Sequence, residues 1–197
     1  MVMPRKDDFQ HSILVVSGSE QFDPVVKRSL PEGDFMTVDF LRSASSARRN
    51  ILERYYDIVI INAPLPDDSG IDLAMDIAEE TSISVLIVTT PDIYGDVLER
   101  VTDVGILAIQ KPFQRGLLNK SIRYLISVQN KLQKLSKEIS TAKEKLEEIK
   151  IISRAQVLLI EKKGMTEDEA HRFIGSEAMN EGISRRRAAE RIMDDLE

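Results

Sequence analysis

The feature of the sequence that most restricts its fold is a long helical pattern between Gly116 and Lys163. No Gly or Pro interrupts this stretch after Gly116, and Lys, Glu, Gln and Ser fill its polar positions, so a helix costs little there. Apolar residues recur in it at alternating spacings of three and four, as in the seam of a two-stranded coiled coil. The seam residues are Leu125, Val128, Leu132, Leu135, Ile139, Ala142, Leu146 and Ile149. The seam has no partner within its own neighbourhood, so we expect a homodimer.

The part of the chain before this helix predicts a parallel α/β domain. Five short apolar stretches, rich in β-branched residues, alternate with helical patterns in units of about 20 residues. The expected strands are residues 11–17, 35–40, 57–63, 83–90 and 105–109. The fold class is therefore α/β, with a five-stranded parallel sheet covered by helices on both faces. In such sheets the functional crevice lies at the carboxyl ends of the strands.

The part of the chain after the long helix predicts a small three-helix domain. Gly164 is expected to end the long helix, and Thr166 with Glu169 forms a capping box that opens a second helix. Gly182 is expected to end the second helix, and Ser184 to cap a third. The expected inner faces are Ala170, Phe173, Ile174, Ala178 and Met179 on the second helix, and Ala188, Ala189, Ile192 and Leu196 on the third.

The heptad pattern changes before the long helix reaches this small domain. The next seam positions fall on Ser153 and Gln156, which are polar, so the two-stranded seam is expected to stop there. Apolar residues continue on a wider stripe suited to packing against further helices, at Ile151, Ile152, Ala155, Leu158 and Leu159.

The composition excludes several classes of protein. There is no cysteine, and His11 and His171 are the two histidines, so we expect neither disulfides nor a metal site, and no other cofactor. The charged N-terminus has no apolar run after it, and no stretch approaches the roughly 18 apolar residues of a membrane span. We therefore expect a cytoplasmic protein that does not enter a membrane.

The net charge of −6 is distributed unevenly. Residues 1–117 carry 11 Lys and Arg against 19 Asp and Glu, whereas residues 118–197 carry 16 against 14. The acidic first part is unsuited to nucleic acid, and the C-terminal part is compatible with it.

Three motifs follow one another in the α/β part. They are DIVIINAPLPDDSGIDLA at residues 57–74, Thr89 at the end of the fourth strand and Lys111 in the KPF after the fifth. Together with the order of elements, they make residues 11–125 resemble the flavodoxin-like receiver domain of bacterial response regulators. The resemblance implies a phosphoryl acceptor aspartate at the end of the third strand, and two acidic residues after the first strand that hold Mg²⁺.

This chain departs from that chemistry. Aligned on Pro66, the acceptor position falls on Asn62 and the acidic pair on Ser17 and Gly18. An amide is a poor nucleophile, and none of these residues offers a hard anionic ligand to Mg²⁺. We therefore interpret the domain as a pseudo-receiver that neither binds Mg²⁺ tightly nor takes phosphate, and we expect no catalytic residue.

The other receiver positions are mixed. Thr89 and Lys111 match the switch threonine and lysine, whereas the aromatic switch position falls on Ala108. Asp67 and Asp68 lie one turn beyond the acceptor position, and one of them would have to act as a substitute acceptor if the domain were phosphorylated. We favour their interpretation as ordinary turn residues.

The small domain carries a second resemblance. The segment ISRAQVLLIEKKGMTEDEAHRFIGSEAMNEGISRRRAAERI resembles the ANTAR module, a three-helix RNA-binding output domain of bacterial antiterminators. The matching positions are Ala155, Leu158, Gly164, Glu169 to His171, Ala178, Met179 and Ala189. The order receiver-like domain, coiled coil and ANTAR is most similar to the amidase antiterminator type, whose receiver also lacks phosphorylation chemistry. Gln156 stands where many members have Lys, which removes a positive charge from a face that the family uses.

RNA binding requires Lys and Arg toward phosphates and polar or planar groups toward unstacked bases. The candidates are Arg154, Lys162, Lys163, His171, Arg172, Arg185, Arg186 and Arg187. The run of three arginines falls in the first turn of the third helix, where the helix dipole does not favour cations, and this indicates a functional reason for them.

We predict four segments: a polar leader at 1–10, a pseudo-receiver at 11–116, a coiled-coil helix at 117–150 and an ANTAR domain at 151–197. The chain is expected to be a non-enzymatic transcription antitermination regulator that binds stem-loops in nascent leader mRNA as a dimer, controlled by a regulatory protein partner. Two alternatives stay open. One is a protein-interaction adaptor without RNA binding, and the other is a response regulator phosphorylated at a non-standard aspartate.

Overall fold

The computed structural model describes residues 10–31 and 33–196, so the expected polar leader at 1–10 lies outside the described residues except for Gln10. The described chain forms two compact units that divide after Leu132, inside one long helix. Within the described residues, no helix combines the length and apolarity needed to cross a membrane.

The first unit is built on a five-stranded parallel sheet. Its strands are β1 (His11–Ser17), β2 (Phe35–Leu41), β3 (Ile58–Asn62), β4 (Ser84–Thr89) and β5 (Leu107–Gln110). Their order is β2-β1-β3-β4-β5, and every neighbouring pair is parallel. β1 and β3 are buried along their whole length, as expected for β-branched strands covered on both faces. The predicted sheet is confirmed.

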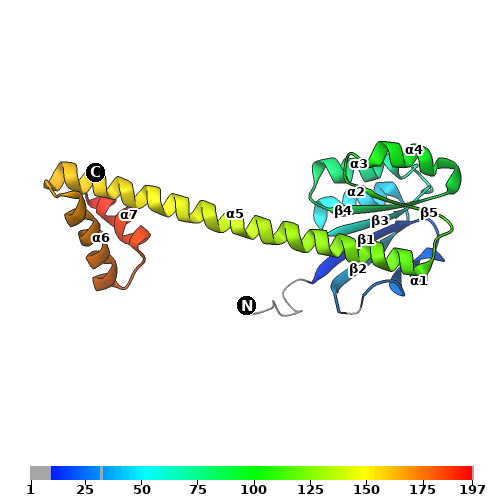
Figure 1. Ribbon diagram of the computed structural model, residues 1–197, viewed down its shortest axis with the longest axis horizontal. Helices are drawn as coiled ribbons and strands as arrows, with labels where there is room; N and C mark the ends of the chain where they lie inside the picture. The colour runs from blue at the N-terminus through cyan, green and yellow to red at the C-terminus, as the bar shows by residue number, and fades with distance from the viewer. Residues whose placement is uncertain (1–9, 32, 197) are drawn as a thin grey trace. The chain divides into compact units, whose positions relative to one another are not determined.

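Helices cover both faces of this sheet (Figure 1). One face carries α2 (Ala44–Glu53), α3 (Ile71–Glu80) and α4 (Pro91–Val101), whose apolar residues join one core cluster. The other face carries α1 (Phe22–Lys27) and the first turns of α5 (Arg115–Lys163), which join a second cluster. The strand order reverses between β1 and β3, and this places the functional crevice at their carboxyl ends.

The first turns of α5 belong to this unit and not to a coiled coil. Leu118 and Ile122 are fully buried, and Leu125 and Ile126 are 3% and 8% exposed in the same cluster. The domain boundary predicted at residue 116 is therefore too early, and the unit continues to Leu132. Burying one such side chain stabilises by about 1.5–3 kcal/mol, so Leu125 is held by its own sheet and does not belong to a dimer seam.

A buried polar cluster joins α5 to the amino-terminal ends of the strands. His11 on β1 is 1% exposed, its Nε2 lies 3.0 Å from Asn130 Oδ1, and its Nδ1 lies 3.6 Å from Asp57 Oδ2. Gln129 Nε2 donates hydrogen bonds to Ser82 O at 2.8 Å and to Ser84 Oγ at 2.9 Å. The polar contacts of Gln129 and Asn130 hold the last turns of α5 that belong to this unit.

The second unit contains the rest of α5 with α6 (Glu167–Glu181) and α7 (Arg185–Leu196). Its core contains the predicted inner residues, among them Ala155, Leu159, Ala170, Ile174, Ala178, Ala188, Ala189 and Ile192. Gly164 follows α5 with a positive φ of 67°, and the Thr166–Glu169 capping box opens α6. Met179 contradicts the prediction: it is 81% exposed, because it points about 100° away from Ala178 and so lies outside the buried face of α6.

His11 makes the stability of the first unit depend on pH. Asp57 raises the pKa of His11 above its ordinary value of 6.5 and outweighs the opposing effect of burial, with smaller contributions from Asn130 and Asp34. A raised pKa means that protonated His11 stabilises the folded state below pH 6.5 and that this contribution is lost as pH rises through the folded-state pKa. We expect the free energy of unfolding to fall as the pH rises from 6.5 through the raised folded-state pKa of His11.

Urea unfolding at several pH values measures this dependence. In His11→Asn the free energy of unfolding should fall less steeply with pH over this range than in the unsubstituted protein. The control is His171→Asn, because His171 is exposed on α6. Equal slopes in all three proteins would show that His11 contributes nothing.

Candidate functional site

The side chains of the expected phosphorylation site come from the carboxyl ends of neighbouring strands. Ser17 ends β1 and Asn62 ends β3, and the two are register partners. Asn62 Nδ2 donates a hydrogen bond of 2.8 Å to Ser17 Oγ, which in turn donates one of 3.0 Å to Ser19 O. The structure therefore brings these predicted residues together, but they bond to one another.

Gly18 has no room for a larger side chain. A Cβ atom at Gly18 would lie 2.7 Å from Pro66 Cγ and 2.9 Å from Pro66 Cδ. The proline ring is rigid and occupies the space into which an acidic side chain would extend. Mg²⁺ needs hard, preferably charged oxygen ligands, and the Ser17 hydroxyl and the Asn62 amide supply no negative charge. The residue set at this site does not fit Mg²⁺.

The retained switch residues are held by the backbone. Lys111 Nζ donates a hydrogen bond of 2.8 Å to Ala63 O, and burial lowers the pKa of Lys111. Thr89 Oγ1 and Asn62 Oδ1 are both buried and form no hydrogen bond within the described part of the chain. Ala108 packs against the core on the α2–α4 side. The pocket has kept the polarity of a phosphorylation site without its charge.

Asp67 and Asp68 are structural turn residues. Asp67 accepts hydrogen bonds from Ala44 N at 2.8 Å, Ser45 N at 3.0 Å and Ser45 Oγ at 2.8 Å at the start of α2. The backbone hydrogen bond from Ser45 is the main cause that lowers the pKa of Asp67. Asp68 Oδ1 accepts a hydrogen bond of 2.6 Å from Gly70 N. Both carboxylates are therefore engaged in local backbone geometry, as a helix cap and a turn are.

The basic residues predicted to contact RNA lie on three helices of the second unit, and all are exposed. They are Arg154, Lys162 and Lys163 on α5, His171 and Arg172 on α6, and Arg185, Arg186 and Arg187 on α7. Arg172 Nε donates a hydrogen bond of 3.2 Å to Asp168 O in its own helix.

The three arginines differ from one another, because successive residues of a helix point about 100° apart. Arg185 extends along α6, where its Nη2 would lie 3.8 Å from a Cβ atom on Gly175. Arg186 Nε is 2.9 Å from Glu190 Oε1 and also interacts with the charges of Glu147 and Glu148. Arg187 is exposed, and its side chain forms no ion pair within the described ranges. Arg187 therefore differs from Arg186 in having no carboxylate partner among the described residues.

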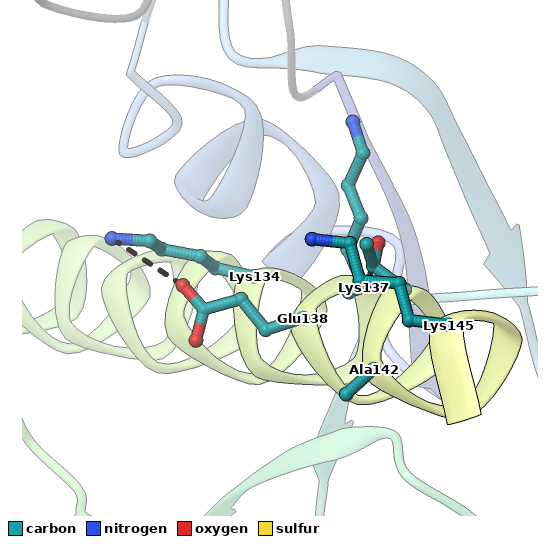
Figure 2. Close-up of a pocket in the computed structure, with 6 residues that line it drawn as sticks. Lys134, Lys137, Glu138, Ala142 and Lys145 are labelled. Carbon is teal, nitrogen blue, oxygen red and sulfur yellow. Dashed lines mark hydrogen bonds and ion pairs between the residues drawn. The ribbon is translucent and has the colours of Figure 1, made fainter. Parts of the chain in front are cut away.

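The predicted seam residues beyond Leu132 form an exposed apolar stripe on α5. Their exposed fractions are 45% for Leu132, 44% for Leu135, 55% for Ile139, 54% for Leu146 and 61% for Ile149. Figure 2 shows the helix surface beside Ala142, lined by lysines and by Glu138, which lies 3.9 Å from Lys134. All its lining residues come from α5, so this hollow is the open side of one helix and not an enclosed pocket.

The sequence reasoning missed two apolar residues beyond the predicted end of the seam. Val157 and Ile160 are 50% and 37% exposed, on a helix whose Ala155 and Leu159 are fully buried. A signal was available, because Val157 follows Leu146 by 11 residues and Ile160 follows Ile149 by 11 residues. Eleven residues make about three helical turns and return a side chain to nearly the same face.

The contact between Gly18 and Pro66 predicts the effect of a single methyl group. Gly18→Ala should destabilise the first unit by about 1–3 kcal/mol, because the added Cβ overlaps a rigid ring. The matched control is Gly95→Ala in α4, where a Cβ meets no atom within 4 Å. That substitution should stabilise by about 0.5–1 kcal/mol. Denaturant unfolding of both variants measures the difference, and equal effects would contradict the overlap.

The chain matches two protein families. Residues 13–123 match the response regulator receiver domain family, and residues 140–193 match the ANTAR domain family. Over 141 residues the chain is 35% identical to the transcriptional regulatory protein PdtaR from two strains of Mycobacterium tuberculosis, and the match covers 71% of this chain and 68% of that protein.

Solved structures agree with this fold. The signal receiver domain of an HD domain-containing protein from Pseudomonas fluorescens Pf-5 superposes with a TM-score of 0.56 at 23% identity, covering 64% of this chain and 93% of that one. The receiver domain of a putative Luxo repressor protein from Vibrio parahaemolyticus gives a TM-score of 0.57 at 20% identity, covering 65% and 98%. The chain belongs to the response regulator receiver family and carries a C-terminal ANTAR domain, the architecture of RNA-binding antitermination regulators, which are not enzymes.

Proposed function

We propose that the chain is a dimeric antiterminator that binds stem-loops in nascent leader mRNA through paired ANTAR domains, and that phosphorylation of its receiver domain does not control it. The observation that carries this proposal is the Asn62–Ser17 hydrogen bond in the position of a phosphorylation site, in a chain that ends in an ANTAR domain. Binding would favour the RNA structure that prevents a terminator hairpin, so that polymerase continues.

Control without phosphate needs another source of free energy. Asn62 carries no charge, and the Pro66 ring leaves no space for a side chain at position 18. Asp67 accepts a hydrogen bond from the backbone at the start of α2. A regulatory protein that binds one assembly state better than another would supply the bias, since a ligand shifts an equilibrium only by its differential affinity for the two states. We propose such a partner, acting on dimer assembly or on access to the RNA-binding surface.

The homodimer is supported by the exposed stripe on α5. From Leu132 to Ile149 the large apolar side chains stay about half exposed, and burying the exposed half of each would stabilise by about 0.7–1.5 kcal/mol. A second copy of the same stripe is complementary to it, as in other two-stranded coiled coils. The pairing would bring two ANTAR domains into one molecule.

The absence of phosphorylation is tested with small-molecule phosphodonors. Incubation of the full chain with acetyl phosphate and Mg²⁺ should give no stoichiometric modification by mass spectrometry, and beryllofluoride should not change its tyrosine fluorescence. A receiver with an intact acceptor aspartate, treated in parallel, serves as the positive control. A modified fraction that maps to Asp67 or Asp68 would favour the response regulator alternative.

RNA binding is tested with the full chain and a pool of stem-loop RNAs whose loops are randomised. We expect measurable affinity at low salt, and Arg187→Ala should weaken it. The slope of the logarithm of the binding constant against the logarithm of the salt concentration should become shallower by about 0.9, the value for one phosphate contact. The triple substitution of Arg185, Arg186 and Arg187 by Ala should weaken binding further.

The matched control is a triple variant of the first unit, Arg49→Ala, Lys120→Ala and Arg123→Ala, which also removes three positive charges. It should bind RNA with the affinity of the unsubstituted chain. These three side chains are exposed. If no stem-loop RNA binds at low salt, the proposal fails and the protein-interaction adaptor remains.

A further inference from the structure

The three-helix core of the second unit uses only one face of α5. Ala155 and Leu159 are fully buried in that core, and Ile151 and Ile152 pack against it. The opposite face is not covered by α6 or α7, although it carries Val157 at 50% exposure and Ile160 at 37%. Two such residues alone need no partner, but as a continuation of the exposed stripe on α5 they extend an apolar surface that another element can cover.

This pair continues the exposed stripe of the same helix. Beyond Leu146 the same face of α5 carries Ile149, Ser153, Val157 and Ile160, at successive spacings of three, four, four and three residues. The extra spacing of four is a stutter, which locally unwinds a coiled coil and keeps its seam on one side. In a strict heptad the seam reaches the polar Gln156 and stops. With the stutter it continues through Val157 and Ile160. Ser153 is then the one polar residue between Leu146 and Ile160 on the seam.

We propose that a second copy of this chain packs in parallel along α5 as far as Ile160, so that the dimer seam runs through the first helix of each ANTAR domain. This inference rests on the dimer in the proposed function and extends it. The two three-helix cores then lie on the outer sides of one continuous helix pair, back to back, with α6 and α7 facing away from the seam.

Charge decides for the parallel direction. In a parallel pair Glu138 meets Lys143 of the second copy, and although Lys145 meets Lys150, the Lys150 ammonium is already 2.8 Å from Glu147 Oε1 in its own helix. An antiparallel pair that sets Leu146 opposite Ala142 of the second copy places Lys145 against Lys145 and Lys143 against Lys143. Like charges face each other on both sides of that arrangement, which disfavours it.

Disulfide trapping tests the proposal cleanly, because the chain contains no cysteine. A disulfide forms only where two Cα atoms come within about 4.4–6.8 Å. Single variants of the full chain, Leu146→Cys, Ile160→Cys and Glu161→Cys, are oxidised and separated on a non-reducing gel. Leu146→Cys and Ile160→Cys should cross-link to similar extents, and Glu161→Cys, the exposed neighbour outside the stripe, only weakly.

The other outcomes separate the two proposals. Cross-linking at position 146 without cross-linking at position 160 overturns the extended seam and leaves the shorter dimer standing. Cross-linking between Leu132→Cys and Ile160→Cys in a mixed sample, without cross-linking of Ile160→Cys to itself, overturns the parallel direction. No cross-link in any variant, with sedimentation as a monomer, overturns the dimer as well.

A substitution gives an independent measure. Ile160→Lys should raise the dimer dissociation constant at least about tenfold in sedimentation experiments, and Glu161→Lys should leave it within about threefold. Circular dichroism checks that both variants keep their helices, since the side chain of Ile160 lies outside the three-helix core. An unchanged dissociation constant in Ile160→Lys overturns the extended seam.

Discussion

The structure depends on the burial of one helix, α5, in two separate cores. Its first turns bury Leu118 and Ile122 against the sheet, and its last turns bury Ala155 and Leu159 among three helices. Between these ends α5 has to remain helical without a core of its own. Exposed helices are marginal in water, and what they lack is an apolar partner. The stretch between the two cores is therefore the place where this protein can gain most from a second chain.

The carboxyl ends of β1 and β3 show how a fold keeps its architecture when the residues at a site differ from those of its family. Register between β1 and β3 still places residue 17 beside residue 62, because that register is set by buried β-branched side chains elsewhere in the strands. Only the polar groups at the strand ends have changed, and they satisfy part of one another's hydrogen bonding. Fold and chemistry therefore separate here, as they do in many widely used folds.

Much of this organisation could be predicted from the sequence. The alternation of apolar strands and helices gave the sheet, and the Thr166–Glu169 pair and Gly182 gave the limits of α6, because these signals are local. Leu125 was wrongly placed in a dimer seam, because periodicity reports that a side chain is apolar on one face and does not say which partner covers that face. The overlap of Gly18 with Pro66 joins residues far apart in the chain, so no local pattern could reveal it.

The position of Pro66 has a consequence for how this receiver domain can change over generations. A phosphorylation site of the usual receiver type needs an aspartate at position 62 and acidic residues at positions 17 and 18, and an acidic residue at position 18 requires the proline ring to move. An acidic residue at one of these positions alone adds charge without completing a set of metal ligands. Any sequence change toward such a site therefore has to relieve the contact between Gly18 and Pro66.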